Sequence, residues 1–140
     1  MTEQQPITAT VVPTRQRLAF LPDVFTPRLM MQGEAMIYRQ ADQLSADYNG
    51  GLWAFYRLSN GGFFVAPDND KRYTISVAGN GYEGEVSALA FGMTVTLFVL
   101  GSLCWIENEA LRERFTDNYH QLRQYVLDQP EAGAVLAAID

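Results

Sequence analysis

The chain has 140 residues, of which 48% are hydrophobic and 19% charged, and its formal net charge is −6. This length suits a single domain, and the large apolar share excludes a generally disordered chain. Sixteen acidic side chains outnumber ten basic ones, and Lys71 is the only lysine. Because a general nucleic-acid binder needs a basic face, no direct nucleic-acid binding is expected.

The N-terminal third predicts an extended segment, a loop and a helix. Residues 1–14 are polar and contain two prolines, so we expect an extended arm ahead of one domain over residues 15–140. Pro22 and Pro27 predict a loop. Between residues 32 and 48, apolar side chains recur every three or four positions, which predicts one helical stripe. Its members are Ile37, Ala41, Leu44 and Tyr48.

The middle of the chain changes from a helical period to strand-like runs. We expect strands over residues 52–59, 63–66 and 72–78, separated by turn residues. Asn60-Gly61 tolerates positive φ at both turn positions and therefore predicts a hairpin. Strands followed by helices indicate an α+β fold, with a small antiparallel meander of three to four strands packed against several helices.

Helices are expected in the rest of the chain. Residues 86–106 carry no charge and could span a bilayer by length alone, but acidic residues flank both ends and no basic residue sets an orientation. We therefore expect a buried core helix, with Ser87 as its N-cap, and no membrane association. Asn108 is a suitable cap for the next helix, and Pro130 begins a last short one.

Short chemical motifs favour no catalytic or cofactor site. Residues 79–84 match the dinucleotide-binding pattern G-x-G-x-x-G, but Glu83 and Glu85 would place negative charge beside a pyrophosphate. No second parallel strand follows, so a plain turn at the end of a strand is the better interpretation. Asp68 and Asp70 are followed by two basic residues rather than by further oxygen ligands, which indicates a polar turn.

The cysteine and histidine content also favours no catalytic or metal site. Cys104 and His120 are the only residues of their kinds, too few for a structural zinc site and without the spacing of a nucleophile and its base. We expect no enzyme, no cofactor and no metal. The N-terminus lacks the features of a signal peptide, and the single cysteine suits a reducing cytoplasm.

Several stretches together resemble the ArdB/KlcA family of antirestriction proteins, which bacterial plasmids and other mobile elements carry. The most specific stretch is residues 48–63, read YNGGLWAFYRLSNGGF, which Ala66-Pro67-Asp68 continues. Further matches lie at residues 17–22, 33–35, 119–123 and 138–140. The resemblance covers most of the chain from about Arg17 onward.

The resemblance implies a small cytoplasmic bacterial protein that lets incoming unmodified DNA escape type I restriction. It implies no catalytic activity and no cofactor. The expected partner is the host type I restriction-modification system or an associated host protein. A small binding domain unrelated to restriction stays open as an alternative.

One mechanism for antirestriction is DNA mimicry, in which carboxylates imitate phosphates. A compact domain of this length is roughly 35–40 Å across. Duplex DNA of that length carries about 20 charges. The chain has only 16 acidic residues in all, interleaved with ten basic ones. We therefore prefer specific protein–protein contacts and keep the DNA-mimic inhibitor as the alternative.

Four residues in the matched stretches have side chains suited to such contacts. Arg17 could form a bidentate ion pair with a partner, or pair with Glu34 inside the chain. Trp53 is of the type enriched at interface hot spots, although a core position suits it as well. Asp140 adds a carboxylate at the chain terminus. Arg17, Glu34, Trp53 and Asp140 are the interaction candidates.

Overall fold

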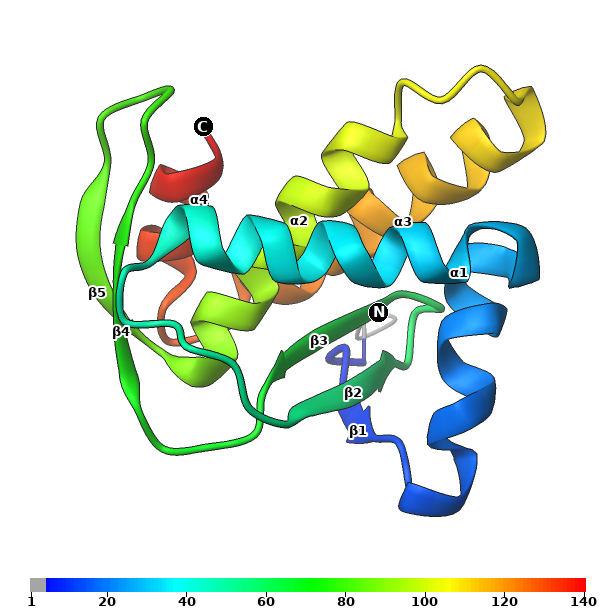
Figure 1. Ribbon diagram of the computed structural model, residues 1–140, viewed down its shortest axis with the longest axis horizontal. Helices are drawn as coiled ribbons and strands as arrows, with labels where there is room; N and C mark the ends of the chain where they lie inside the picture. The colour runs from blue at the N-terminus through cyan, green and yellow to red at the C-terminus, as the bar shows by residue number, and fades with distance from the viewer. Residues whose placement is uncertain (1–4) are drawn as a thin grey trace.

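The computed structural model describes residues 5–140 as four helices and five strands (Figure 1). In chain order they are β1 (Ala9–Val11), a 3-10 turn (Thr14–Gln16), α1 (Arg17–Leu44), β2 (Trp53–Leu58), β3 (Phe63–Pro67), β4 (Arg72–Ser76), β5 (Glu83–Ser87), α2 (Ala88–Leu103), α3 (Glu109–Leu127) and α4 (Ala132–Ile139). The α+β class is confirmed.

The strands form two separate antiparallel sheets, β1-β2-β3 and β4-β5. In Figure 1 the first lies below the long second half of α1, and the second stands at the left. The expected pairing of the third meander strand with the second is therefore wrong. β4 pairs instead with β5, whose residues fall partly within the stretch we assigned to the uncharged helix. The physical reason is that α2 occupies the free edge of β3.

Helix α2 closes that edge through a buried side chain. Thr96 is 1% exposed; its hydroxyl accepts a hydrogen bond from the Val65 N–H at 3.2 Å and donates to the Gly92 carbonyl at 2.8 Å. Gly92 permits this close approach, since a Cβ there would lie 2.4 Å from the Val65 carbonyl oxygen. A backbone group that another strand would otherwise pair with is thus satisfied by a helix.

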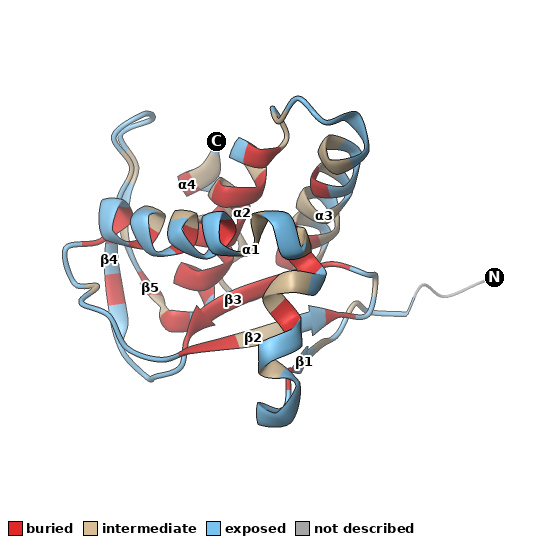
Figure 2. Ribbon diagram, turned by 45° about the vertical axis from the view of Figure 1, so that its right-hand side comes forward, coloured by how far each residue is buried: buried red, intermediate tan, exposed pale blue. Residues whose placement is uncertain are grey.

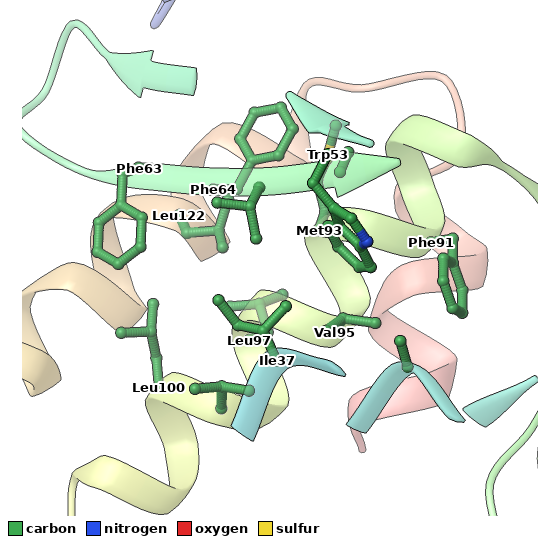
Figure 3. Close-up of a cluster of buried hydrophobic side chains, with 14 of the residues drawn as sticks. Ile37, Trp53, Phe63, Phe64, Phe91, Met93, Val95, Leu97, Leu100 and Leu122 are labelled. Atoms are coloured by element: carbon green, nitrogen blue, oxygen red, sulfur yellow. The ribbon is translucent and has the colours of Figure 1, made fainter. Parts of the chain in front are cut away.

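The uncharged helix is the centre of the core, as the sequence predicts. Ser87 caps α2 by accepting a hydrogen bond from the Ala90 N–H at 3.2 Å. Figure 2 shows α2 mostly buried, and Figure 3 shows its side chains converging with those of β3 and with Ile37 of α1. Within residues 5–140, none of the helices combines the length and apolar character needed to cross a membrane.

Helix α1 begins earlier than the sequence predicts. The expected loop at Pro22 and Pro27 is wrong, because residues on both sides are helical and only Thr26 breaks the path, with φ 71° and ψ 153°. The residue before a proline is disfavoured in the α region, which explains a break at Thr26. The second half then starts at Pro27, which needs no N–H partner there, and ends at Leu44, short of the expected Tyr48.

The expected N-terminal arm contributes a strand. Residues 9–11 form β1 and pair with β2, with Ala9 opposite Leu58 and Val11 opposite Tyr56. The first four residues of the expected arm lie outside the described residues. The domain limits proposed from the sequence stay a prediction.

Turns and caps follow the sequence closely. Gly61 has φ 95°, in the tight turn between β2 and β3 that Asn60-Gly61 predicts. Residues 79–84 contain the turn of the β4–β5 hairpin, with Gly81 at φ 75°, so the plain-turn interpretation of this motif is confirmed. Asn108 caps α3 as expected, through a 3.0 Å hydrogen bond from the Leu111 N–H.

Substitution of Gly92 tests how closely α2 approaches β3. Gly92→Ala places a methyl group against rigid backbone, so we expect the free energy of unfolding to fall by about 3 kcal/mol. Gly101→Ala, in the same helix, meets only ordinary contact at 3.7 Å. It is expected to be neutral or to stabilise by up to about 1 kcal/mol. Urea unfolding measures both, and equal effects would contradict the packing described.

Substitution of Thr26 tests the strain at the kink of α1. Thr26 is a β-branched residue with positive φ, and its hydroxyl is buried without a partner among residues 5–140. Relief of this strain by Thr26→Gly should stabilise the fold by about 1 kcal/mol after the entropic cost of glycine. Thr26→Val, which keeps the branched Cβ, should retain the backbone strain. A destabilising Thr26→Gly, measured by urea unfolding, would contradict the strained kink.

Candidate interaction surfaces

Two of the four predicted contact residues, Glu34 and Trp53, line one crevice between α1 and β2, and a third, Arg17, contacts Trp53 and Phe55 of that lining. Its lining residues are Leu21, Glu34, Ile37, Tyr38, Trp53, Phe55 and Val65. The crevice has a volume of about 10 Å³, room for one water molecule at most. It is therefore too small to be a pocket for a small ligand.

Arg17 is fixed to β2 by two contacts. Its Nη2 donates a hydrogen bond to the Trp53 carbonyl at 2.7 Å, and its guanidinium lies over the Phe55 ring, 4.2 Å from the centroid. No ion pair between Arg17 and Glu34 occurs in the described part of the chain. Arg17 is partly exposed, and its guanidinium is held in place by these two contacts.

The contacts continue along the face of β2 that the first half of α1 covers. Phe20 stacks on Phe55 with 4.7 Å between ring centroids, and the guanidinium of Arg57 lies 5.1 Å from the centroid of Phe20. Asp23 completes the series with a 2.8 Å ion pair to Arg57. Alternating aromatic rings and guanidinium groups hold the first half of α1 against β2.

Trp53 belongs to the core. It is 3% exposed, and its indole Nε1 donates a hydrogen bond to the Tyr48 hydroxyl at 3.1 Å. Its ring packs edge-on against Tyr38, with 6.0 Å between centroids. Trp53 therefore supports the surface from beneath, and Tyr38, which is 39% exposed, is the most exposed aromatic residue of the crevice. The sequence did not single out Tyr38, although its spacing four residues after Glu34 places both on one helix face.

The surroundings of Tyr38 shift the pKa of its hydroxyl upward. Burial raises the pKa of Tyr38 above its usual 10.0, the negative charge of Glu34 raises it further, and Arg17 opposes the increase. A protonated phenol both donates and accepts hydrogen bonds. The surface thus combines a carboxylate, a guanidinium edge and a phenol, which can make directional contacts with a protein.

Asp140 lies in a different part of the molecule. The residue is exposed at the end of α4, near Tyr119 of α3, and its negative charge contributes to raising the pKa of Tyr119, for which burial is the main cause. The structure therefore does not bring Asp140 together with the other three candidates at the α1–β2 crevice.

The sequence selected the less exposed of the two tryptophans. Trp105 is 88% exposed, whereas Trp53 is 3% exposed. The sequence places Trp105 inside the expected helix of residues 86–106, whereas α2 ends at Leu103 and leaves Trp105 in the loop before the Asn108 cap. Trp53, in a strand beside a Gly-Gly turn, was indistinguishable from an interface residue until its packing was known.

The remaining chemical candidates are the metal-ligating side chains and the single cysteine and histidine. Within residues 5–140, no three His, Cys, Asp or Glu side chains lie close enough to hold a metal ion. Cys104 is partly buried, and its Sγ donates to the Leu100 carbonyl at 3.2 Å. His120 is exposed on α3 beside Tyr119, with 5.6 Å between ring centroids.

Removal of the Arg17 side chain tests how much its contacts with β2 contribute to the stability of the fold. Arg17→Ala loses a charge-assisted hydrogen bond and a cation–π contact, and we expect the free energy of unfolding to fall by about 1–2 kcal/mol. Arg15→Ala, an exposed arginine in the preceding 3-10 turn, should change it by less than about 0.5 kcal/mol. Thermal or urea unfolding measures the difference, and equal effects would show that Arg17 is not held as described.

Comparison with known proteins identifies the family. The antirestriction protein family pattern matches residues 46–140. Antirestriction protein KlcA of Escherichia coli is 48% identical over 140 residues, covering 99% of both chains. A second Escherichia coli KlcA is 45% identical over 138 residues, 96% of this chain and 94% of that one.

A solved KlcA structure agrees with the whole fold. It matches 100% of this chain and 99% of its own, with a TM-score of 0.89 and 48% identity. The KlcA and ArdB proteins are described there as having a novel fold and antirestriction activity against type I DNA restriction systems in vivo but not in vitro. The chain described here belongs to the antirestriction protein family.

Proposed function

We propose that this protein relieves host type I restriction of incoming unmodified DNA, through specific contacts with a protein of the bacterial cytoplasm. The observation that carries the proposal is 48% identity with KlcA along the full length and on the same fold. The partner is the type I restriction-modification system or a host protein associated with it. The proposed role is inhibition, with no catalytic step and no cofactor.

Protein contacts fit the distribution of charge better than DNA mimicry does. Several acidic side chains at the surface are already paired, as Asp23 with Arg57 at 2.8 Å and Glu85 with Arg72 at 2.9 Å. Paired carboxylates do not present a continuous row of negative charge like that of a DNA backbone. The description of KlcA and ArdB as active in vivo but not in vitro supports the same choice, since a DNA mimic would compete directly with DNA for the purified enzyme.

We propose Arg17 and Glu34 as contact residues, together with Tyr38, and Trp53 as their support. Arg17 and Tyr38 are already positioned by packing, so binding would immobilise few free side chains. Asp140 is a separate proposed contact, because its exposed carboxylate lies apart from this group.

Plating of unmodified phage on a type I restricting host tests the function and the sites. Expression of the parent chain should raise the plating efficiency. Glu34→Ala, Arg17→Ala and Asp140→Ala should each reduce this relief by at least about tenfold, as expected for loss of an interface anchor. Circular dichroism confirms folding, and Arg15→Ala and Glu83→Ala serve as exposed controls.

Two results would count against the proposal. A parent chain that gives no relief of restriction would reject the function and favour a binding domain of another role. Full protection by all three variants would reject the contact residues while leaving the function in place.

A further inference from the structure

Trp105 is presented to solvent on a well-held loop. It is 88% exposed, more than any other aromatic side chain in residues 5–140. The backbone N–H of Trp105 donates a hydrogen bond to the Ser102 carbonyl at 3.3 Å. The backbone carbonyl of Ile106 accepts one from the Arg112 guanidinium at 3.2 Å. In Figure 1 the α2–α3 loop projects at the upper right, away from both sheets. Its hydrogen bonds show that the exposure of Trp105 does not come from fraying.

Two surface hollows flank this loop, and they differ in chemistry. The hollow beside Trp105 has a volume of about 320 Å³ and includes the apolar side chains of Phe98, Tyr119 and Ile139. The hollow beside the preceding residue, Cys104, also measures about 320 Å³ but is lined by polar and charged groups. The exposed indole therefore borders a hollow with apolar side chains, and the neighbouring residue Cys104 borders a charged one.

The charged hollow belongs to an acidic face of α3. Glu109, Glu113 and Asp117 are exposed and recur every four residues, so they share one side of the helix. The two arginines of the same stretch point to backbone. Arg112 donates to two carbonyls of the α2–α3 loop at 3.2 and 3.4 Å, and Arg114 donates to a carbonyl of α1. The free hydrogen-bonding groups on this face are therefore mostly carboxylates.

We propose that Trp105, the apolar hollow beside it and the acidic face of α3 form a second docking surface, whose occupant is a positively charged protein surface with an apolar pocket for an indole. This deepens the proposed function and rests on it. An exposed, pre-positioned tryptophan is the side chain most enriched among interface hot spots. The three carboxylates select a partner rich in arginine or lysine and steer its approach.

The same charges disfavour other occupants. DNA and the anionic surface of a membrane would both be repelled by Glu109, Glu113 and Asp117. A second copy of the chain, related by two-fold symmetry, would bring like charges against one another at this surface. A basic protein surface is the occupant that satisfies both the apolar and the acidic part.

Photocrosslinking in restricting cells tests the proposal on the full chain. A photoreactive phenylalanine replaces Ser102, which lines the apolar hollow, and leaves Trp105 in place. We expect crosslinks to peptides of one host protein in which arginine and lysine outnumber acidic residues. Trp105→Ala, and separately the pair Glu113→Lys with Asp117→Lys, should lower the crosslink yield and the relief of restriction by at least about tenfold. Glu83→Lys on β5 is a charge-reversal control outside α3.

The remaining outcomes overturn the surface. They are crosslinks only to the chain itself, to nucleic acid or to an acidic peptide, no crosslink at all, and yields that Glu83→Lys lowers as much as the α3 variants do. Plating of the parent chain separates the two proposals. Relief by the parent together with any of these outcomes rejects the docking surface alone, whereas no relief by the parent rejects the proposed function.

Discussion

The closure of the β3 edge by α2 is the constraint on which the rest of the structure depends. Thr96 supplies the hydrogen bond that a neighbouring strand would give to Val65, and Gly92 lets the helix come close enough to do so. As a result the third strand of a meander has no edge to join, and β4 pairs with β5 as a separate hairpin. The other three helices then pack around α2, which fixes where the α2–α3 loop leaves the core.

Much of this fold could be predicted from sequence, because local chemistry decides it. Ser87 and Asn108 cap the helices they were expected to cap, and the absence of charge in α2 indicated its burial. The strand pairing could not be predicted, since a long-range hydrogen bond from a helix side chain decides it. The two prolines of α1 predict a loop because each disfavours a helix interior, yet only Thr26 leaves the helical path.

Contact residues were harder to predict because exposure depends on tertiary packing. Glu34 lines the α1–β2 crevice and Arg17 contacts β2 beside it, but Trp53 is buried. Trp105, which the sequence does not indicate as a contact residue, is exposed. The distribution of charge over the surface also depends on tertiary packing. A net charge of −6 is too small and too mixed for a DNA mimic, yet the orientation of two arginines leaves one side of α3 acidic. Specific surfaces, rather than overall charge, are where we place the antirestriction activity.

The most direct measurement of this central claim is competition for DNA. A purified type I restriction enzyme is bound to a labelled duplex containing its recognition site, and the chain is added over a range of salt concentrations. Inhibition by protein contacts away from the DNA groove predicts that the affinity of the enzyme for DNA is unchanged at every salt concentration. Displacement of the duplex that weakens steeply as salt rises would contradict the account and identify the protein as a DNA mimic.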